Sequence, residues 1–419
     1  MSVEDFLFVL FPQRKLSKAV LGLPKLNSIS LSSSITQQSL AKILQLSIQP
    51  QLPFWGKVTE LSIRSNEVNI SLKVFFNYLK RLDSLAKFSF KSKPLTIDQL
   101  PAYGNFEVLQ QLKDLNLSIK MAEFSSKDAV KLFEYLSLPP NLTSIELKIT
   151  RLKSCSALDR VSKTFSFFSM ISGLAQLLSF KLHLKVKDKK PKIHHIRAPF
   201  FFALNVVENL PRTLHKLNLT TYHSVLSWSS APLISQDNIL YTLATRLTNL
   251  EEFHIDLLGV NLESTCPGFK VLGNLKRISL GNLVLASGFW GKLNLEGVVE
   301  IKCMIKREIE VMDLEWFLRE VNVFPRLKSF SLNVMKVHCE RLTYNLGREL
   351  LRIFQELREL RGLELCLPSV YVRKEVAEWF LQLCRFKKSL EFCKIKFRDC
   401  RIYKDIFELK MQENIKVEL

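Results

Sequence analysis

The sequence predicts an α/β solenoid of about thirteen irregular strand-turn-helix repeats that share one parallel sheet. Three observations lead to this prediction: leucine supplies 73 of the 419 residues, a short apolar pattern recurs along the chain, and the stretches between its copies have helical periodicity. With 47% hydrophobic and 24% charged residues, the chain can bury a large core. Glycine is scarce, at 13 residues, which argues against glycine-rich phosphate loops as a dominant feature.

The recurring pattern is apolar-x-x-apolar-x-apolar, and it occurs thirteen times at spacings of 23 to 37 residues. Each copy ends in strict alternation, as in Ile278-Ser279-Leu280, which is typical of a strand with one buried face. By the same alternation, Phe330 and Leu332 should both point into the core. The copies begin at Leu26, Val58, Leu85, Leu112, Leu142, Leu177, Leu214, Leu250, Leu275, Val298, Leu327, Leu360 and Phe392.

Between the copies, apolar residues recur at helical spacing, so each repeat should return through a helix. A single strand-turn-helix unit cannot cover its own apolar faces, and neighbouring units must therefore stack and share a continuous core. The clearest helical faces are Leu72, Phe75, Phe76 and Leu79; Ala129, Leu132, Phe133 and Leu136; Leu314, Phe317, Leu318 and Val321; and Val376, Trp379, Phe380 and Leu383.

From about Leu23 to Cys400, these copies resemble the leucine-rich repeat superfamily, whose strand segment reads LxxLxLxxN/C. The stretches VTELSIRSN from Val58 and FCKIKFRDC from Phe392 match that motif in full. The resemblance implies a curved horseshoe with strands on its concave side and helices on its convex side. Most copies lack Asn or Cys at the ninth position, so the turns should be irregular.

The resemblance also suggests a domain organisation. Residues 1–22, with an amphipathic stretch around Phe6 to Phe11, should form an N-terminal helical cap, residues 23–400 the solenoid, and residues 401–419 a C-terminal cap. The period swells to 37 residues after the sixth copy, where we expect a basic insert at about 185–197.

The sequence carries no pattern that indicates catalysis. It lacks the common phosphate-binding, metalloprotease and serine-hydrolase motifs, so we expect no enzyme, no catalytic residues, no cofactor and no small-molecule substrate. The eight cysteines include no CxxC pair, and no metal site is expected; reduced, mostly buried thiols indicate a soluble intracellular protein, cytoplasmic or organellar. No apolar run is long enough to span a membrane. The five tryptophans should pack in the core or between repeats.

Two surfaces are candidates for partner binding. On the concave face, the third, fifth and seventh positions of the copies hold eleven basic and seven acidic residues, close to the ratio of 60 to 40 in the whole chain, so this face does not read as a nucleic-acid groove. Its candidate partner contacts are Arg64, Lys87, Lys91, Lys148, Lys181, Lys216 and Arg277. The basic insert is the candidate docking element for an anionic partner, through Lys185, Lys187, Lys189, Lys190, Lys192 and Arg197, unless it is only a solvated loop.

A repeat array of this kind offers long surfaces rather than a pocket, so we expect a scaffold or structural subunit that binds other proteins in a large intracellular or organellar assembly. The net charge of +20 favours acidic partners and leaves a second hypothesis open, a basic adaptor of a ribonucleoprotein complex that contacts RNA or acidic protein surfaces. A free adaptor in signalling or ubiquitin transfer is a third.

Overall fold

A computed structural model shows the chain as two units: unit 1 comprises Met1–Leu214 and Thr221–Val225, and unit 2 comprises His215–Thr220 and Leu226–Leu419. The predicted N-terminal cap and the predicted helices at Leu72 to Phe76 and Ala129 to Leu136 lie outside the described residues. The structure describes residues 27–31, 57–64, 79, 82–91, 109–120, 137–152, 165–186, 198–223, 234–235, 242–243, 245–256, 260–261, 272–281, 296–321, 324, 326–339, 341–398, 401–405 and 416–418.

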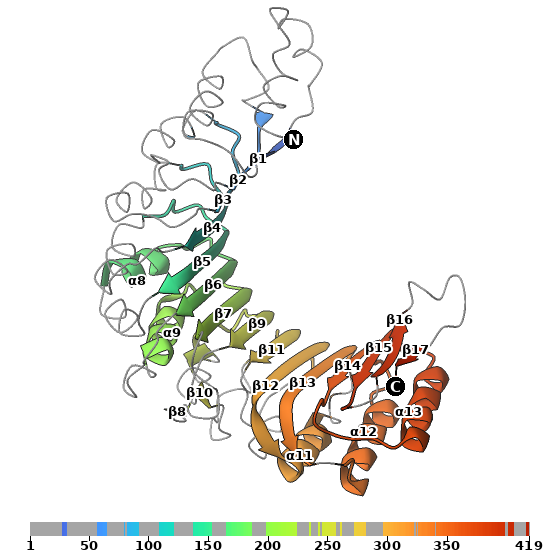
Figure 1. The fold of residues 1–419 in the computed structure, drawn as a ribbon. Coiled ribbons are helices and arrows are strands. Elements are labelled where there is room, and N and C mark those ends of the chain that lie inside the picture. Colours follow the sequence, from blue (N-terminus) through green and yellow to red (C-terminus); the bar gives the residue numbers. More distant parts are fainter. Residues whose placement is uncertain are drawn as a thin grey trace, which may run out of the picture. The chain divides into compact units, whose positions relative to one another are not determined.

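Unit 1 is a parallel sheet in which each strand pairs with the next one along the chain (Figure 1). Helices α8 (Phe165–Ser172) and α9 (Ala198–Asn209) lie on one side of these strands, and the opposite face carries no described helix (Figure 1). The strands are β1 (Ser28–Leu31), β2 (Glu60–Arg64), β3 (Lys87–Lys91), β4 (Asp114–Lys120), β5 (Ser144–Leu152) and β6 (Ser179–Val186).

Unit 2 continues the same pattern with seven described parallel strands, followed by two antiparallel strands at the C-terminal end. The parallel strands are β7 (Lys216–His223), β9 (Glu252–Asp256), β11 (Arg277–Gly281), β12 (Glu300–Glu310), β13 (Ser329–His338), β14 (Gly362–Cys366) and β15 (Phe392–Lys396). The antiparallel strands are β16 (Arg401–Asp405) and β17 (Lys416–Glu418); β8 (Ile234–Ser235) and β10 (Val260–Asn261) pair separately. The helices are α11 (Val311–Val321), α12 (Tyr344–Glu356) and α13 (Lys374–Phe386).

One backbone arrangement repeats at almost every described copy. The carbonyl of the second residue of a copy accepts two N–H groups from the next copy: Thr59 O accepts from Ala86 N and Lys87 N, both at 2.9 Å. Lys328 O accepts in the same way from Arg361 N at 2.8 Å and Gly362 N at 2.9 Å. Because copies joined in this way are fixed to one another through this carbonyl, the strands within each unit start at the same level and stay in register.

The apolar residues of the pattern fill the core behind the sheet. In every copy from the second to the twelfth, the first apolar residue is at most 1% exposed, and the two that follow point inward as well. Phe330 and Leu332 are fully buried, as predicted. On α11, the predicted face of Leu314, Phe317, Leu318 and Val321 is buried too. The predicted strand phase and this helix are therefore confirmed.

The thirteenth copy corrects the prediction by two residues. Leu363 and Leu365 pair with Cys393 and Ile395, so this copy begins at Leu390 rather than at Phe392. The carbonyl of Arg361 accepts from Glu391 N and Phe392 N, as the repeat rule requires of this new start. The shift moves Lys394 from the third to the fifth position of the copy and Lys396 from the fifth to the seventh. Arg398 then no longer belongs to the open-face positions. A cysteine at the second apolar position hid the true phase.

The helix α13 also differs from the prediction, because its buried residues are Ala377, Phe380 and Cys384, whereas Trp379 is 37% exposed. On α11, Trp316 is 49% exposed and lies against the guanidinium of Arg319 at 5.9 Å. Neither of these two tryptophans lies in the core, although Trp379 packs edge-on against Phe380, and the other three lie outside the described residues. Charged groups join α11 to α12 instead: the fully buried Glu349 accepts from Arg352 at 3.1 Å and faces Arg319 at 3.6 Å.

The strand phase of β13 can be tested by substitution. Leu332→Asp would bury a carboxylate without a partner and should lower the free energy of unfolding by about 4 kcal/mol or more. The matched control is Asn333→Asp, because Asn333 is the next residue and is exposed. Thermal unfolding followed by circular dichroism should show a large loss for the first variant and little for the second. Equal melting of both variants would contradict this phase.

Candidate interaction surface

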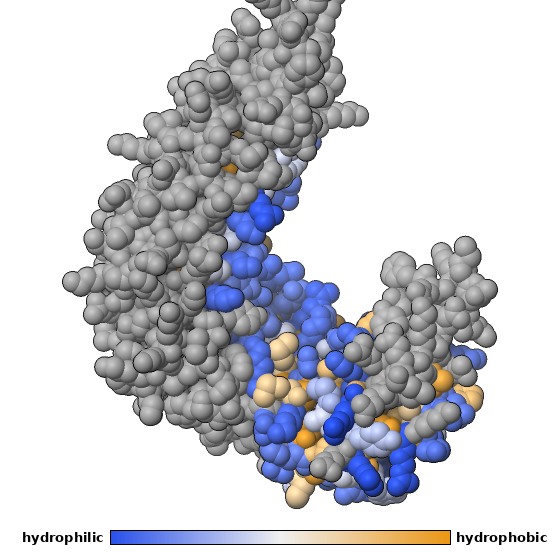
Figure 2. All heavy atoms as spheres, in the orientation of Figure 1, coloured by the Kyte–Doolittle hydropathy of each residue, from blue (hydrophilic) through white to orange (hydrophobic). Residues whose placement is uncertain are grey.

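The face of the sheet opposite the helices, which we call the open face, displays the third, fifth and seventh residues of each copy in three rows. The strand pairing aligns these residues: Glu60, Lys87 and Asp114 are register partners in the first row, and Arg64, Lys91 and Ser118 in the third. Where the described strands are in view, Figure 2 shows hydrophilic residues along this face. All seven predicted concave-face contacts, Arg64, Lys87, Lys91, Lys148, Lys181, Lys216 and Arg277, occupy rows of the open face.

The first row is a ladder of opposite charges. In unit 2, Glu252 lies between Lys216 at 3.1 Å and Arg277 at 2.7 Å, and Arg277 also meets Glu300 at 3.2 Å. In unit 1, Lys87 and Glu60 are 2.7 Å apart. The hydrogen bond from Lys87 lowers the pKa of the Glu60 carboxyl, and the same bond raises the pKa of Lys87. Lys87, Lys216 and Arg277 are therefore engaged within the sheet.

The second row is less charged and partly paired. Lys394 meets Glu364 at 3.0 Å, and Ser331 donates to the same carboxylate at 3.1 Å. The ring of His254 lies 2.6 Å from Ser279 Oγ. Lys181 is 3.8 Å from Glu146, a looser contact. In unit 1 this row is otherwise made of small polar residues, Ser62, Ser89 and Asn116.

The third row of unit 1 differs from both. Arg64, Lys91 and Lys148 are exposed, and none of them has an ion-pair partner in the part of the chain that the structure describes. His183 follows Lys148 in register. Partial burial lowers the pKa of His183, because burial disfavours the charged ring, and Lys148 and Lys181 lower it further against the opposing effect of Glu146. Burial is thus the main cause of the lowered pKa, and the charges around the imidazole oppose one another.

A hollow of about 360 Å³ lies beside this row, over the first and second rows of β1 to β5. Its polar lining includes Ser62, Ser89 and Asn116, together with the carboxylates of Glu60, Asp114 and Glu146.

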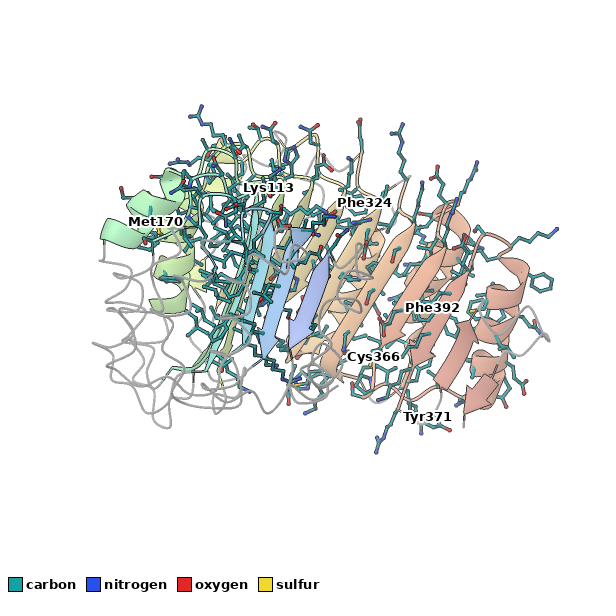
Figure 3. All side chains as sticks on the ribbon, turned by 90° about the horizontal axis from the view of Figure 1, so that it is seen from above. Lys113, Met170, Phe324, Cys366, Tyr371 and Phe392 are labelled. Atoms are coloured by element: carbon teal, nitrogen blue, oxygen red, sulfur yellow. The ribbon has the colours of Figure 1, made fainter. Side chains whose placement is uncertain are left out.

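Within unit 2, Phe324 precedes β13 at one edge of the strands, and Cys366 and Tyr371 lie at the other edge (Figure 3). A second hollow, of about 510 Å³, lies near this second edge and is lined by Lys336, His338, Ser369 and Arg398 among others.

The basic insert falls mostly outside the described residues. Lys187, Lys189, Lys190, Lys192 and Arg197 belong to that part of the chain. Lys185 is described: it belongs to β6, which extends to Val186, and its side chain is exposed. Lys185 and Val186 are therefore strand residues, and the insert over residues 187–197 stays a prediction.

Where the structure describes the chain, it contains no cluster of three or more His, Cys, Asp or Glu side chains that could hold a metal ion. No helix in the described ranges is both long enough and apolar enough to cross a membrane. The five cysteines within those ranges carry reduced thiols, and Cys303, Cys384 and Cys393 are buried. Burial alone raises the pKa of Cys303 far above its ordinary value.

Each LxxLxL copy contributes one strand, and within each unit consecutive strands pair in parallel with their leucines in the core. The fold is of the leucine-rich repeat type. Comparison with models of protein families finds no match, and comparison with curated proteins finds none either.

Among solved structures, the chain is similar to TLR13 in its complex with ssRNA13, with 14% identity and a TM-score of 0.40 over 84% of this chain and 47% of that one. It spans about half the length of that TLR13 chain. An internalin (inlF) from Listeria monocytogenes has 13% identity and a TM-score of 0.34, over 92% of this chain and 96% of that one. A chain of the octameric complex of Latrophilin 3, Unc5D and the leucine-rich repeats of FLRT2 has 14% identity and a TM-score of 0.35, over 74% of this chain and 83% of that one.

The sequence analysis did not predict a buried ion pair that crosses one strand of the sheet. Asp256, in the third row of unit 2, is only 3% exposed and meets Lys306 Nζ at 2.6 Å, although β11 lies between their strands. The carboxylate can cross β11 because Gly281, its register partner there, has no side chain: a Cβ at 281 would overlap with Cβ and Cγ of Asp256. A glycine inside a strand is a known signal of such close approach.

This crossing predicts a specific glycine requirement. Gly281→Ala should lower the free energy of unfolding by about 1–3 kcal/mol, because the methyl group must displace the Asp256 carboxylate or the strand itself. Gly273→Ala is the matched control, since a Cβ there would meet nothing within 4 Å. Urea unfolding of the two variants and the wild type measures the difference. A Gly281→Ala variant as stable as Gly273→Ala would show that the crossing does not constrain β11.

Proposed function

We propose that the chain is a non-enzymatic scaffold, a structural subunit of a larger intracellular or organellar assembly, and that its open face binds other proteins. The observation that carries this proposal is the open face itself. It presents three aligned rows of mostly polar side chains and no described helix covers it. Rigid strands hold these side chains at fixed spacing, and a preorganised surface loses little entropy when a partner docks.

The ion pairs of the open face distinguish residues that bind one another within the sheet from residues that a partner could contact. The first-row ladder is satisfied within the sheet, so its cations give the face a fixed charge pattern rather than free charges. The second row and the third row of unit 1 carry the polar groups and cations that a partner can engage. The net charge of +20 would attract acidic partners over a distance.

Bulky substitutions on the open face test this proposal. Asn116→Trp in unit 1 and Asn333→Trp in unit 2 should each block a partner by shape, while the inward-facing core remains unchanged. Gln355→Trp, at an exposed position of α12 outside the rows, is the matched control. Affinity purification of the three variants from the native source, with quantitative mass spectrometry, should show that at least one open-face variant loses partners that Gln355→Trp retains. Identical partner sets for all variants and the wild type would contradict it.

A second candidate function is that of a basic adaptor that contacts RNA or an acidic protein through the insert. It is supported by the exposed Lys185, which leads directly into a run rich in lysine. Replacement of Lys185, Lys187, Lys189, Lys190 and Lys192 by Ser should leave the melting temperature unchanged, because Lys185 is exposed on β6 and we expect the other four to lie in a loop outside the core. Affinity for the anionic partner and its salt dependence should both fall. Equal binding by variant and wild type at low ionic strength would mean that the insert is only a solvated loop.

A further inference from the structure

The cations and carboxylates of unit 1 occupy different rows of the open face. The carboxylates are half-buried and belong to the first and second rows, where Glu60 binds Lys87 and Glu146 lies near Lys181. At the described third-row positions from β2 to β6 there is no acid at all, only Arg64, Lys91, Ser118, Lys148 and His183. Lys185 extends this edge by one further exposed cation on β6. The result is a positive edge next to a balanced surface.

The spacing of this positive edge suits an extended polypeptide. Neighbouring strands are about 4.8 Å apart, so the edge from β2 to β6 measures about 19 Å. An extended segment of about six residues covers that length, with side chains on one side every 7 Å or so. Three acidic side chains at alternate positions can therefore reach Arg64, Lys91 and Lys148 together, because the long side chains of arginine and lysine absorb the difference in spacing.

The surroundings of the edge favour a protein partner over nucleic acid. Single-stranded nucleic acid binds through base stacking on aromatic side chains, and the described open-face positions of β2 to β6 hold no Phe, Tyr or Trp. The adjoining hollow is lined by three carboxylates, those of Glu60, Asp114 and Glu146. It has one cation in its lining, Lys87, which is paired with Glu60, so the excess charge is negative and disfavours a uniformly anionic backbone. A peptide can place acids along the cations and neutral side chains over Ser62, Ser89 and Asn116.

We infer that the third row of unit 1 binds an acidic, extended segment of a partner protein, with Arg64, Lys91 and Lys148 as its carboxylate contacts. This inference rests on the proposed scaffold function and names the chemistry of one partner. The hollow beside the row receives the uncharged side chains of the same segment.

A defined peptide tests the inference on the full chain. The probe is a fluorescently labelled eight-residue peptide of alternating Glu and Ser, and its affinity is measured by fluorescence anisotropy at low ionic strength. Lys91→Ser/Lys148→Ser should weaken binding about tenfold, the size that two exposed charge contacts can reach together. The matched control is Lys57→Ser/Lys113→Ser, which removes the same charge from exposed residues that precede strands β2 and β4, and should change affinity less than twofold. Thermal unfolding should be the same for both double variants.

The outcomes separate this inference from the proposed function. Failure of the wild type to bind the peptide, or an equal loss of affinity in the two double variants, would contradict the inference that the third row binds an acidic segment. So would an eight-nucleotide oligouridine that binds as tightly as the peptide and depends on the same two lysines, because the edge would then be a nucleic-acid site. In each case the scaffold proposal still stands if Asn116→Trp or Asn333→Trp loses partners. If neither loses any, the scaffold proposal fails whatever the peptide does.

Discussion

The double hydrogen bond at the second residue of almost every described copy is the constraint on which the open face depends. Because one carbonyl accepts two consecutive N–H groups of the next copy, as Thr59 O does from Ala86 and Lys87, successive strands cannot slip along one another without breaking both bonds. A slip of one residue would also expose the leucines. Fixed register places residues some 30 positions apart side by side, and it converts a one-dimensional repeat into rows of side chains with defined neighbours.

Local pattern was enough to predict the strands because burial enforces it in each copy independently. Prediction failed where a copy departs from leucine. At the last copy, Cys393 stands at the second apolar position, and Lys387 occupies the place where other turns have Leu82, Leu109 or Leu357. Lys387 compensates by donating to Phe354 O at 2.7 Å, and burial lowers its pKa. Helix faces were harder still, because a helix such as α13 can rotate by one residue and remain amphipathic.

The charges of the open face could be counted from the sequence but not sorted. The ratio of eleven basic to seven acidic positions is close to that of the whole chain, but this count ignores which residues are neighbours. Pairing across strands removes Lys87, Lys216 and Arg277 from the available cations, whereas Arg64 and Lys91 have no acid beside them in the third row. Register between distant segments decides this, and composition carries no information about it. The basic insert, obvious in the sequence, is therefore not the only positive feature.

Unit 2 shows why the same row need not have the same role throughout. At the level where unit 1 exposes cations, unit 2 has Asp256 buried against Lys306 across Gly281. Burying two charges is expensive, and the pair persists only because its partners face each other at 2.6 Å. In this part of the third row, Asp256 and Lys306 connect β9 to β12 across β11, so their charges neutralise each other. Neighbouring positions there, such as Met304, are 41% exposed and apolar. The two units therefore present different chemistry in the same row: exposed cations in unit 1, and a buried ion pair near the exposed, apolar Met304 in unit 2.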